Sequence, residues 1–298
     1  MKYMTRDGAE EGADSLQDRF LRAVYGTLAG RILIRPFLGA AVSRAAGKFL
    51  STHVSAYLVK PFVQSAGIDL SQCEKQKFDS YNDFFTRKLR KGARPLDQRE
   101  NVLVSPCDGR LSVYPIDEGM QVSVKQTEYS VRDLLRDRKL AECYAGGWLF
   151  LFRLSVEDYH RYIFPDSGYQ GRIRRINGLF HTVNPAAGDV CPIYKENTRE
   201  YCILNSVHFG RVLMMEVGAM LVGQIENRPG MRSVMRGEEK GNFAFGGSTV
   251  ILMFRKGWVK PDADIVSNSG RGYETKVLQG EAVGTALRRK KGSESNEA

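Results

Sequence analysis

A chain of 298 residues with 42% hydrophobic and 10% aromatic content can bury a sizeable core, which excludes a wholly disordered protein. Its 44 Lys and Arg residues against 34 Asp and Glu give a formal net charge of +10, which favours an anionic partner without choosing among nucleic acid, an acidic lipid surface and a small acid. Five cysteines, an odd number without a C-x-x-C pair, argue against a disulfide framework and against a zinc site.

The first residues are polar and mixed in charge, and we expect residues 1–18 to form a flexible N-terminus. Asp7, Glu10 and Glu11 lie where a signal peptide or a transit peptide would be basic. No apolar run reaches the length of about 18 residues that a membrane span needs. The sequence therefore predicts a soluble or peripheral protein.

The next stretch, FLRAVYGTLAGRILIRPFLGAAVSRAAGKFL (residues 20–50), combines apolar residues with cations and contains no acid. Pro36 should divide it into two helices, because proline interrupts the helical hydrogen-bond ladder. Basic amphipathic helices suit the surface of an anionic bilayer, and we predict an amphipathic helical membrane arm over residues 19–60. A helical hairpin that packs on the core, with its arginines in solvent, is the alternative.

Residues 61–285 read as one catalytic domain of α+β class, with a mainly antiparallel β core. A helix is expected over Ser80–Arg90 with Ser80 as its cap, and Ser130 should cap a shorter helix that runs toward Leu135. Residues 286–298 are low in hydrophobicity and are expected to be a disordered tail. Short apolar runs between turn signals predict strands at Val102–Val104, Leu111–Val113, Val122–Val124, Trp148–Leu154, Val212–Val217, Met220–Ile225 and Thr249–Phe254.

Three residues are candidates for chemistry, and each also has a structural interpretation. His160 follows the apolar run WLFLFRLSV, where a histidine at a strand end can act as a general base or simply fill the core. Asp108 stands in SPCDGR, and Asp-Gly is first of all a turn signal. Ser248 follows Gly246 and Gly247, which permit either a strained peptide bond or an ordinary β-bulge at the strand start.

Other enzyme classes lack their signatures. The serine is not in a G-x-S-x-G elbow, because residues 246–250 read GGSTV, which disfavours a lipase or esterase. No GxxxxGK[ST] loop and no HExxH motif occurs, so nucleotide and metal chemistry have no support. Nucleic-acid binding has only the net charge in its favour, and we expect no nucleic-acid partner.

Seven segments, in this order along the chain, resemble the phosphatidylserine decarboxylase family. They span about three fifths of the sequence, residues 80–257, and together are far more specific than any one of them alone. The segments are NDFFTR, SPCDGR, DYHRY, FHTVNP, IYKENTRE, VGAMLVGQI and RGEEKGNFAFGGSTV.

The resemblance implies a precursor that cuts itself between Gly247 and Ser248 into a beta chain, residues 1–247, and an alpha chain, residues 248–298. The Ser248 hydroxyl would attack the Gly247 carbonyl with help from a serine-protease-like charge relay of Asp108, His160 and Ser248. Elimination and hydrolysis would then convert Ser248 into a covalent pyruvoyl group, the pyruvate cofactor of the family.

The implied activity is that of a carboxy-lyase. The pyruvoyl ketone would form a Schiff base with the amine of phosphatidylserine, and loss of carbon dioxide would give phosphatidylethanolamine. The implied partners are the lipid substrate, an anionic membrane surface and the protein's own two chains as a heterodimer. We expect a peripheral protein on the cytoplasmic face of the cell membrane, and a homo-oligomer remains open.

The chain departs from the family pattern at two positions. Many members have leucine where Gly246 stands, and many have a second histidine where Ile163 stands. His181 is therefore a reserve candidate for the base, and Asp158 is a secondary site candidate. Two other functions compete: a lipid-binding scaffold that has lost activity, and a pyruvoyl-dependent decarboxylase of a soluble amino acid.

Overall fold

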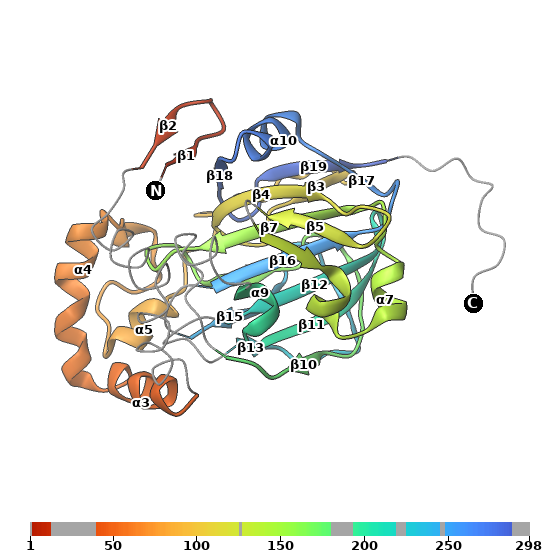
Figure 1. Ribbon diagram of the computed structural model, residues 1–298. Coiled ribbons are helices and arrows are strands. Elements are labelled where there is room, and N and C mark those ends of the chain that lie inside the picture. The colour runs from red at the N-terminus through yellow and green to blue at the C-terminus, as the bar shows by residue number, and fades with distance from the viewer. Residues whose placement is uncertain are drawn as a thin grey trace.

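The computed structural model describes residues 2–12, 40–124, 127–179, 193–218, 225–244 and 248–287. Within these residues the centre of the molecule is a sheet of eleven strands (Figure 1). Its order is β14 (Arg232–Val234), β9 (Gly168–Gln170), β11 (Arg199–Ser206), β12 (Gly210–Val217), β16 (Ser248–Phe254), β7 (Trp148–Leu154), β4 (Gly109–Pro115), β18 (Glu274–Val277), β1 (Tyr3–Met4) and β2 (Glu10–Glu11), with β10 (Arg174–Ile176) also paired to β11.

Two smaller sheets pack on one face of the large sheet. One has the order β13 (Ile225–Asn227), β15 (Glu239–Phe243), β8 (Arg161–Ile163), and the other β17 (Val259–Pro261), β19 (Ala282–Ala286), β3 (Val102–Val104). Side chains alternate along a strand, so every second residue of β16 faces these sheets. Val250, Leu252 and Phe254 share a buried cluster with Tyr162 and Phe243.

The opposite face of the large sheet is covered by a hairpin and short helices. These are β5 (Gln121–Val124), β6 (Thr127–Ser130), α6 (Val131–Leu135), α7 (Arg138–Glu142) and α9 (Ile193–Glu196). Ile251 and Met253 of β16 pack here with Leu134 and Tyr194. A further helix, α10 (Ala263–Gly270), packs on β4 and β18.

The helices near the N-terminus form a separate unit at one end of the large sheet (Figure 1). They are α3 (Ala40–Leu50), η2 (His53–Leu58), α4 (Val59–Ala66), η3 (Leu70–Gln72) and α5 (Tyr81–Phe85). Leu50, Val59, Tyr81, Phe84 and Phe85 bury a small core of their own. None of the helices among the described residues has the length and apolarity to cross a bilayer.

The predicted antiparallel β core is confirmed, since β1 and β18 are the one parallel pair among the named strands that the structure describes. The strands at Val102–Val104 and Trp148–Leu154 have the predicted bounds. The helix after Ser80 is shorter than predicted. Ser80 does cap it through Asp83 N at 3.1 Å, but it ends at Phe85, because the chain then turns to pair Leu89 with Cys73.

Some sequence expectations differ from the structure or fall outside it. Ser130 precedes α6 but its side chain makes no cap bond, because Ser130 is the last residue of strand β6. Residues 3–11 form a two-stranded hairpin on the sheet edge where a flexible segment was expected. The arm up to residue 39, most of the strand expected at Met220–Ile225 and the tail from residue 288 lie outside the described residues.

Candidate active site

Three central strands meet at one end of the large sheet. Strand β16 begins there with Ser248, which pairs with Leu154, the last residue of β7. On the other side of β7, a Cβ added to Gly109 at the start of β4 would lie 2.7 Å from the carbonyl oxygen of Arg153. Gly109 and Ser248 therefore flank the end of β7, and two strand spacings put them roughly 10 Å apart. The strand order thus brings Asp108 and Ser248 to the same edge.

Ser248 is fully buried and lies on the face of β16 that the small sheets cover, as Val250 does. Its hydroxyl makes no hydrogen bond to any residue that the structure describes. A buried hydroxyl normally has a partner, and one that lacks it calls for a functional explanation. Gly247, the other half of the expected cleavage site, lies outside the described residues.

His160 comes six residues after the end of β7 and is fully buried. Its ring lies against Phe85, with centroids 4.0 Å apart, and its Nδ1 lies 2.9 Å from the carbonyl oxygen of Asp158. A carbonyl only accepts, so Nδ1 carries the proton and Nε2 carries the lone pair of the neutral ring. Phe243 N donates to the His160 carbonyl at 3.0 Å, which ties the imidazole to the strand that leads to Ser248.

The Asp108 carboxylate is held by two partners. Arg94 donates from Nε to Oδ1 at 2.9 Å and from Nη2 to Oδ2 at 2.6 Å, and Gln279 donates its backbone N–H at 2.8 Å. The Gln279 side chain in turn donates to the carbonyl oxygen of Arg161 at 2.9 Å. Asp108 is therefore linked, through Gln279, to the residue that follows His160.

Asp158 organises the turn between β7 and His160. Its Oδ2 accepts from Ser155 N at 2.6 Å and from Arg110 Nη1 at 3.1 Å. Burial raises the pKa of this carboxyl to about 6, an effect that nearby Glu157 strengthens and Arg110 opposes. Asp158 thus supports the imidazole twice, through its carbonyl and through the turn that its side chain closes.

Four residues at this edge were not predicted as parts of the site. Phe85 and Arg87 lie in the NDFFTR segment, where an aromatic pair followed by arginine was a usable signal. Arg94 and Gln279 carried no signal, because their contacts with Asp108 close over long stretches of sequence. The reserve base, His181, lies outside the described residues.

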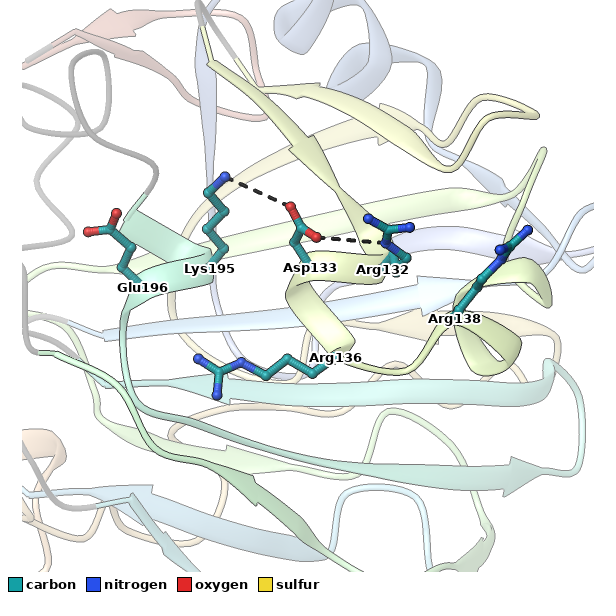
Figure 2. Close-up of a pocket in the computed structure, with 6 residues that line it drawn as sticks. All are labelled: Arg132, Asp133, Arg136, Arg138, Lys195 and Glu196. Atoms are coloured by element: carbon teal, nitrogen blue, oxygen red, sulfur yellow. Dashed lines mark ion pairs between the residues drawn. The ribbon is translucent and has the colours of Figure 1, made fainter.

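A pocket of about 540 Å³ lies on the opposite face of the large sheet (Figure 2). Arg132 and Lys195 each approach Asp133 at 3.9 Å, whereas Arg136 and Arg138 extend away from these pairs. Helices α6 and α7, which carry Arg132, Asp133 and Arg138, pack on the face of β16 that Ser248 does not occupy. This basic pocket is therefore separate from the candidate active site.

Comparisons with known proteins point to one family. A family model described as phosphatidylserine decarboxylase matches residues 81–285. The phosphatidylserine decarboxylase proenzyme 2 of Clostridium acetobutylicum is 40% identical over 265 residues, which cover 89% of this chain and 91% of that protein. The phosphatidylserine decarboxylase proenzyme of Ruminiclostridium cellulolyticum is 41% identical over 276 residues, 90% of this chain and 92% of the relative.

Proposed function

Because the chain belongs to the phosphatidylserine decarboxylase family, we propose that it is a precursor that cuts itself before Ser248 and then converts phosphatidylserine to phosphatidylethanolamine and carbon dioxide. The observation that carries this proposal is Ser248 itself. It is the first residue of a central strand, it is fully buried, and its hydroxyl makes no hydrogen bond within the described part of the chain. Such a hydroxyl is available to react.

In the proposed processing, His160 Nε2 takes the hydroxyl proton of Ser248 as its oxygen attacks the Gly247 carbonyl carbon. The peptide C–N bond breaks and an ester forms, and His160 passes the proton to the serine nitrogen, which is left as an amine. Elimination then removes the Cα proton of residue 248 and releases the Gly247 carboxylate from its Cβ, which leaves an enamine. Water hydrolyses the remaining enamine to a ketone with loss of ammonia, which leaves a pyruvoyl group at the new N-terminus.

The surroundings of Ser248 fit that group. It is smaller than the serine residue with its amine, it replaces a polar hydroxyl that has no described partner, and its neighbours in the core are apolar, among them Leu154 and Val250. A pyruvoyl group supplies a ketone that can accept the electron pair released when a carboxylate leaves as carbon dioxide. In each turnover a protonated Nε2 of His160 gives its proton to the substrate carbon and regains one from solvent before the next, while Phe85 covers one side of the ring.

Asp108 is the third residue of the proposed charge relay. Its carboxylate stabilises positive charge on His160, and through Gln279 it fixes the backbone next to that residue. Asp158 is the proposed secondary residue, which sets the ring orientation through its carbonyl.

The exposed side chains of the N-terminal helices support a peripheral membrane location, which we propose to be the cytoplasmic face. Phe49, Val54, Tyr57 and Leu58 are between 45% and 84% exposed, and Lys48 and Lys60 lie among them. Exposed apolar groups flanked by cations are typical of a surface that inserts into the interface of an anionic bilayer. We propose that the arm of residues 19–60 is joined directly to the catalytic domain of residues 61–285, because helix α4 (Val59–Ala66) spans the boundary between them.

The activity is tested with vesicles that contain phosphatidylserine. The purified protein should convert it to phosphatidylethanolamine, and Ser248→Ala protein should convert none, because it cannot form the ketone. Accumulation of phosphatidylethanolamine is followed by lipid chromatography. If the wild-type protein is cut but acts only on free amino acids, the soluble-substrate alternative replaces the proposal; if it is never cut, the scaffold alternative does.

A further inference from the structure

A pocket of about 520 Å³ opens at the end of the large sheet where β7 stops and β4 starts. Asp158 and Tyr159 line it, and they directly precede His160, so the pocket wall and the proposed base are consecutive residues. Other parts of the lining come from residues 66–69 after α4, Arg87 and Leu89 after α5, Arg94, Asp108 and the end of β18. The pocket therefore lies between the end of helix α4 and the candidate active site.

Arg87 is a buried cation in this wall, with only 5% of its surface exposed. Its Nη2 donates to the carbonyl oxygens of Glu157 at 3.0 Å and Asp158 at 3.1 Å, and its guanidinium lies 4.8 Å from the centre of the Phe84 ring. No acid in the described ranges comes within 4.0 Å of this guanidinium. Burial lowers the pKa of Arg87, as expected for a cation removed from water without a close counterion.

Other arginines with little exposed surface have a carboxylate partner or more backbone hydrogen bonds than Arg87 has. Two at the same end of the sheet have carboxylates: half-buried Arg94 pairs with Asp108 at 2.6 Å, and buried Arg153 with Glu274 at 2.5 Å. Arg199, on the opposite face, donates four hydrogen bonds to backbone carbonyls. Arg87 donates three to backbone carbonyls, one of them long at 3.5 Å, and also contacts the Cys73 thiol, while no carboxylate occupies its planar fork within the described residues.

We propose that Arg87 binds the phosphodiester of a glycerophospholipid head group, and that this pocket is the head-group site of the proposed decarboxylase. The inference rests on the proposed function and names the group that positions its substrate. Arginine is suited to phosphate because its fork matches two oxygens at once.

The carboxylate of the serine head group is a poorer partner for Arg87. Its negative charge disperses as carbon dioxide leaves, so a cation bound to it would stabilise the ground state more than the transition state. The phosphodiester keeps its charge throughout the reaction, and a cation can hold it without raising the barrier. Arg87 therefore serves as an anchor for the lipid and not as a group that touches the reacting bond.

The position of the pocket also accounts for the lipid tails. Ala66, Gly67 and Ile68 border it at the end of α4, the helix that follows the exposed apolar residues Val54 and Tyr57. A head group held at Arg87 would direct its acyl chains along this helical side, toward the proposed membrane surface.

Ser248→Ala precursor, which cannot turn substrate over, allows binding to be measured alone. Short-chain phosphatidylserine and phosphatidylethanolamine, kept below their micelle concentrations, are titrated calorimetrically into this precursor and into the same precursor with Arg87→Gln. We expect Kd to rise roughly ten- to hundredfold for both lipids, because both carry the phosphodiester. Arg90→Gln, which removes a nearby arginine bound to the Cys73 carbonyl, should leave both affinities unchanged.

Equal binding of both lipids to Arg87→Gln protein would overturn the proposal. Loss of phosphatidylserine affinity alone would also overturn it, by assigning Arg87 to the carboxylate, and inorganic phosphate that binds as tightly as the lipids would replace it with a general anion site. If the Arg87→Gln variant does not fold, Arg87→Lys takes its place. It keeps the positive charge but loses the two-pronged guanidinium, and its Kd for both lipids should be higher than that of the protein with Arg87.

Processed enzyme separates this inference from the proposed function. Arg87→Gln should raise KM for phosphatidylserine with little change in kcat, after self-cutting at the normal site. Wild-type protein without decarboxylase activity would end the proposed function; an active wild type with unchanged KM in the variant would end only the head-group assignment.

Discussion

At the scale of single residues, the imidazole of His160 is oriented by the Asp158 carbonyl, which leaves Nε2 as the basic nitrogen. His160→Ala should therefore slow self-cutting by about two to four orders of magnitude, the usual contribution of a general base. The full-length band is followed over time on denaturing gels. His208→Ala is the matched control, because that histidine pairs with Asp166 elsewhere and should not affect cutting. Normal cutting in His160→Ala together with failure in His181→Ala would move the base to His181.

Asp158 gives a second prediction at this scale, through pH. Its pKa is raised to about 6 from 3.8, so the folded chain holds this proton more tightly than the unfolded chain does. The stability it contributes is complete below about pH 4 and is lost as pH rises through about 6. Between about pH 4 and pH 7, the unfolding free energy of Ser248→Ala precursor should fall by about 1–3 kcal/mol relative to the same precursor with Asp158→Asn. Parallel pH curves for the two proteins would contradict the raised pKa.

Sequence motifs predicted which residues gather at the site but not how they are held. Asp108 directly precedes β4 and Ser248 begins β16, the strands on either side of β7, and the apolar runs at Trp148–Leu154 and Thr249–Phe254 predicted two of these three strands. The bonds from Gln279 to Asp108 and from Phe243 to His160 were not, since they depend on which strands become neighbours. The sequence marked Asp158 as a secondary site candidate but did not show that its backbone carbonyl would orient the His160 ring.

At the scale of elements, β15 is fastened to the large sheet by a buried ion pair. Lys240 sits at a register shift in β15 and its Nζ lies 2.8 Å from Glu216 Oε2 on β12, with both side chains fully buried. Lys240→Met should cost about 3–5 kcal/mol in unfolding free energy, because it strands a buried carboxylate. Adding Glu216→Leu should recover most of that loss. Urea denaturation measures the unfolding free energies of both variants in the Ser248→Ala precursor. If Lys240→Met lowers this free energy by less than about 1 kcal/mol, the ion pair contributes little to stability.

The exposed residues of η2 form the second element with a testable role. Val54 and Tyr57 are 65% and 84% exposed, and replacing both by Glu should weaken binding to anionic vesicles roughly tenfold or more, because two apolar contacts are lost and charges repel the surface. Sedimentation with vesicles gives the bound fraction. Met235→Glu, which alters a residue 72% exposed after β14, is the control and should bind normally. If the wild type, the double variant and Met235→Glu all bind anionic vesicles equally, the arm has a structural role only.

Local patterns predicted the elements where local forces decide them. The apolar runs became strands with nearly the predicted bounds, since a continuous apolar run suits a central strand that is buried on both faces. The hairpin at residues 3–11 was missed because its strands have only two residues each and are fixed by contacts with β18 and by Arg6 with Asp262. Such long-range pairings leave no trace in a local pattern.

At the scale of the whole molecule, the proposed cut does not divide the fold into separate bodies. Residues after the cut supply β16, which lies between β12 and β7, as well as β18 and β19 in two different sheets. The two chains would therefore stay together through strand pairing and a shared core, as a heterodimer of one gene's product. The buried, uncharged strand TVILMF explains why separation would be costly.

The intact mass of the purified wild-type protein under denaturing conditions tests the central claim most directly. The account predicts two chains, residues 1–247 and residues 248–298, with the smaller one lighter by one ammonia than its serine-initiated form because a pyruvoyl group replaces the N-terminal serine. Ser248→Ala protein should give one chain of full length. A wild-type protein that remains a single full-length chain after long incubation, or a smaller chain that begins with an unmodified serine, would contradict the account.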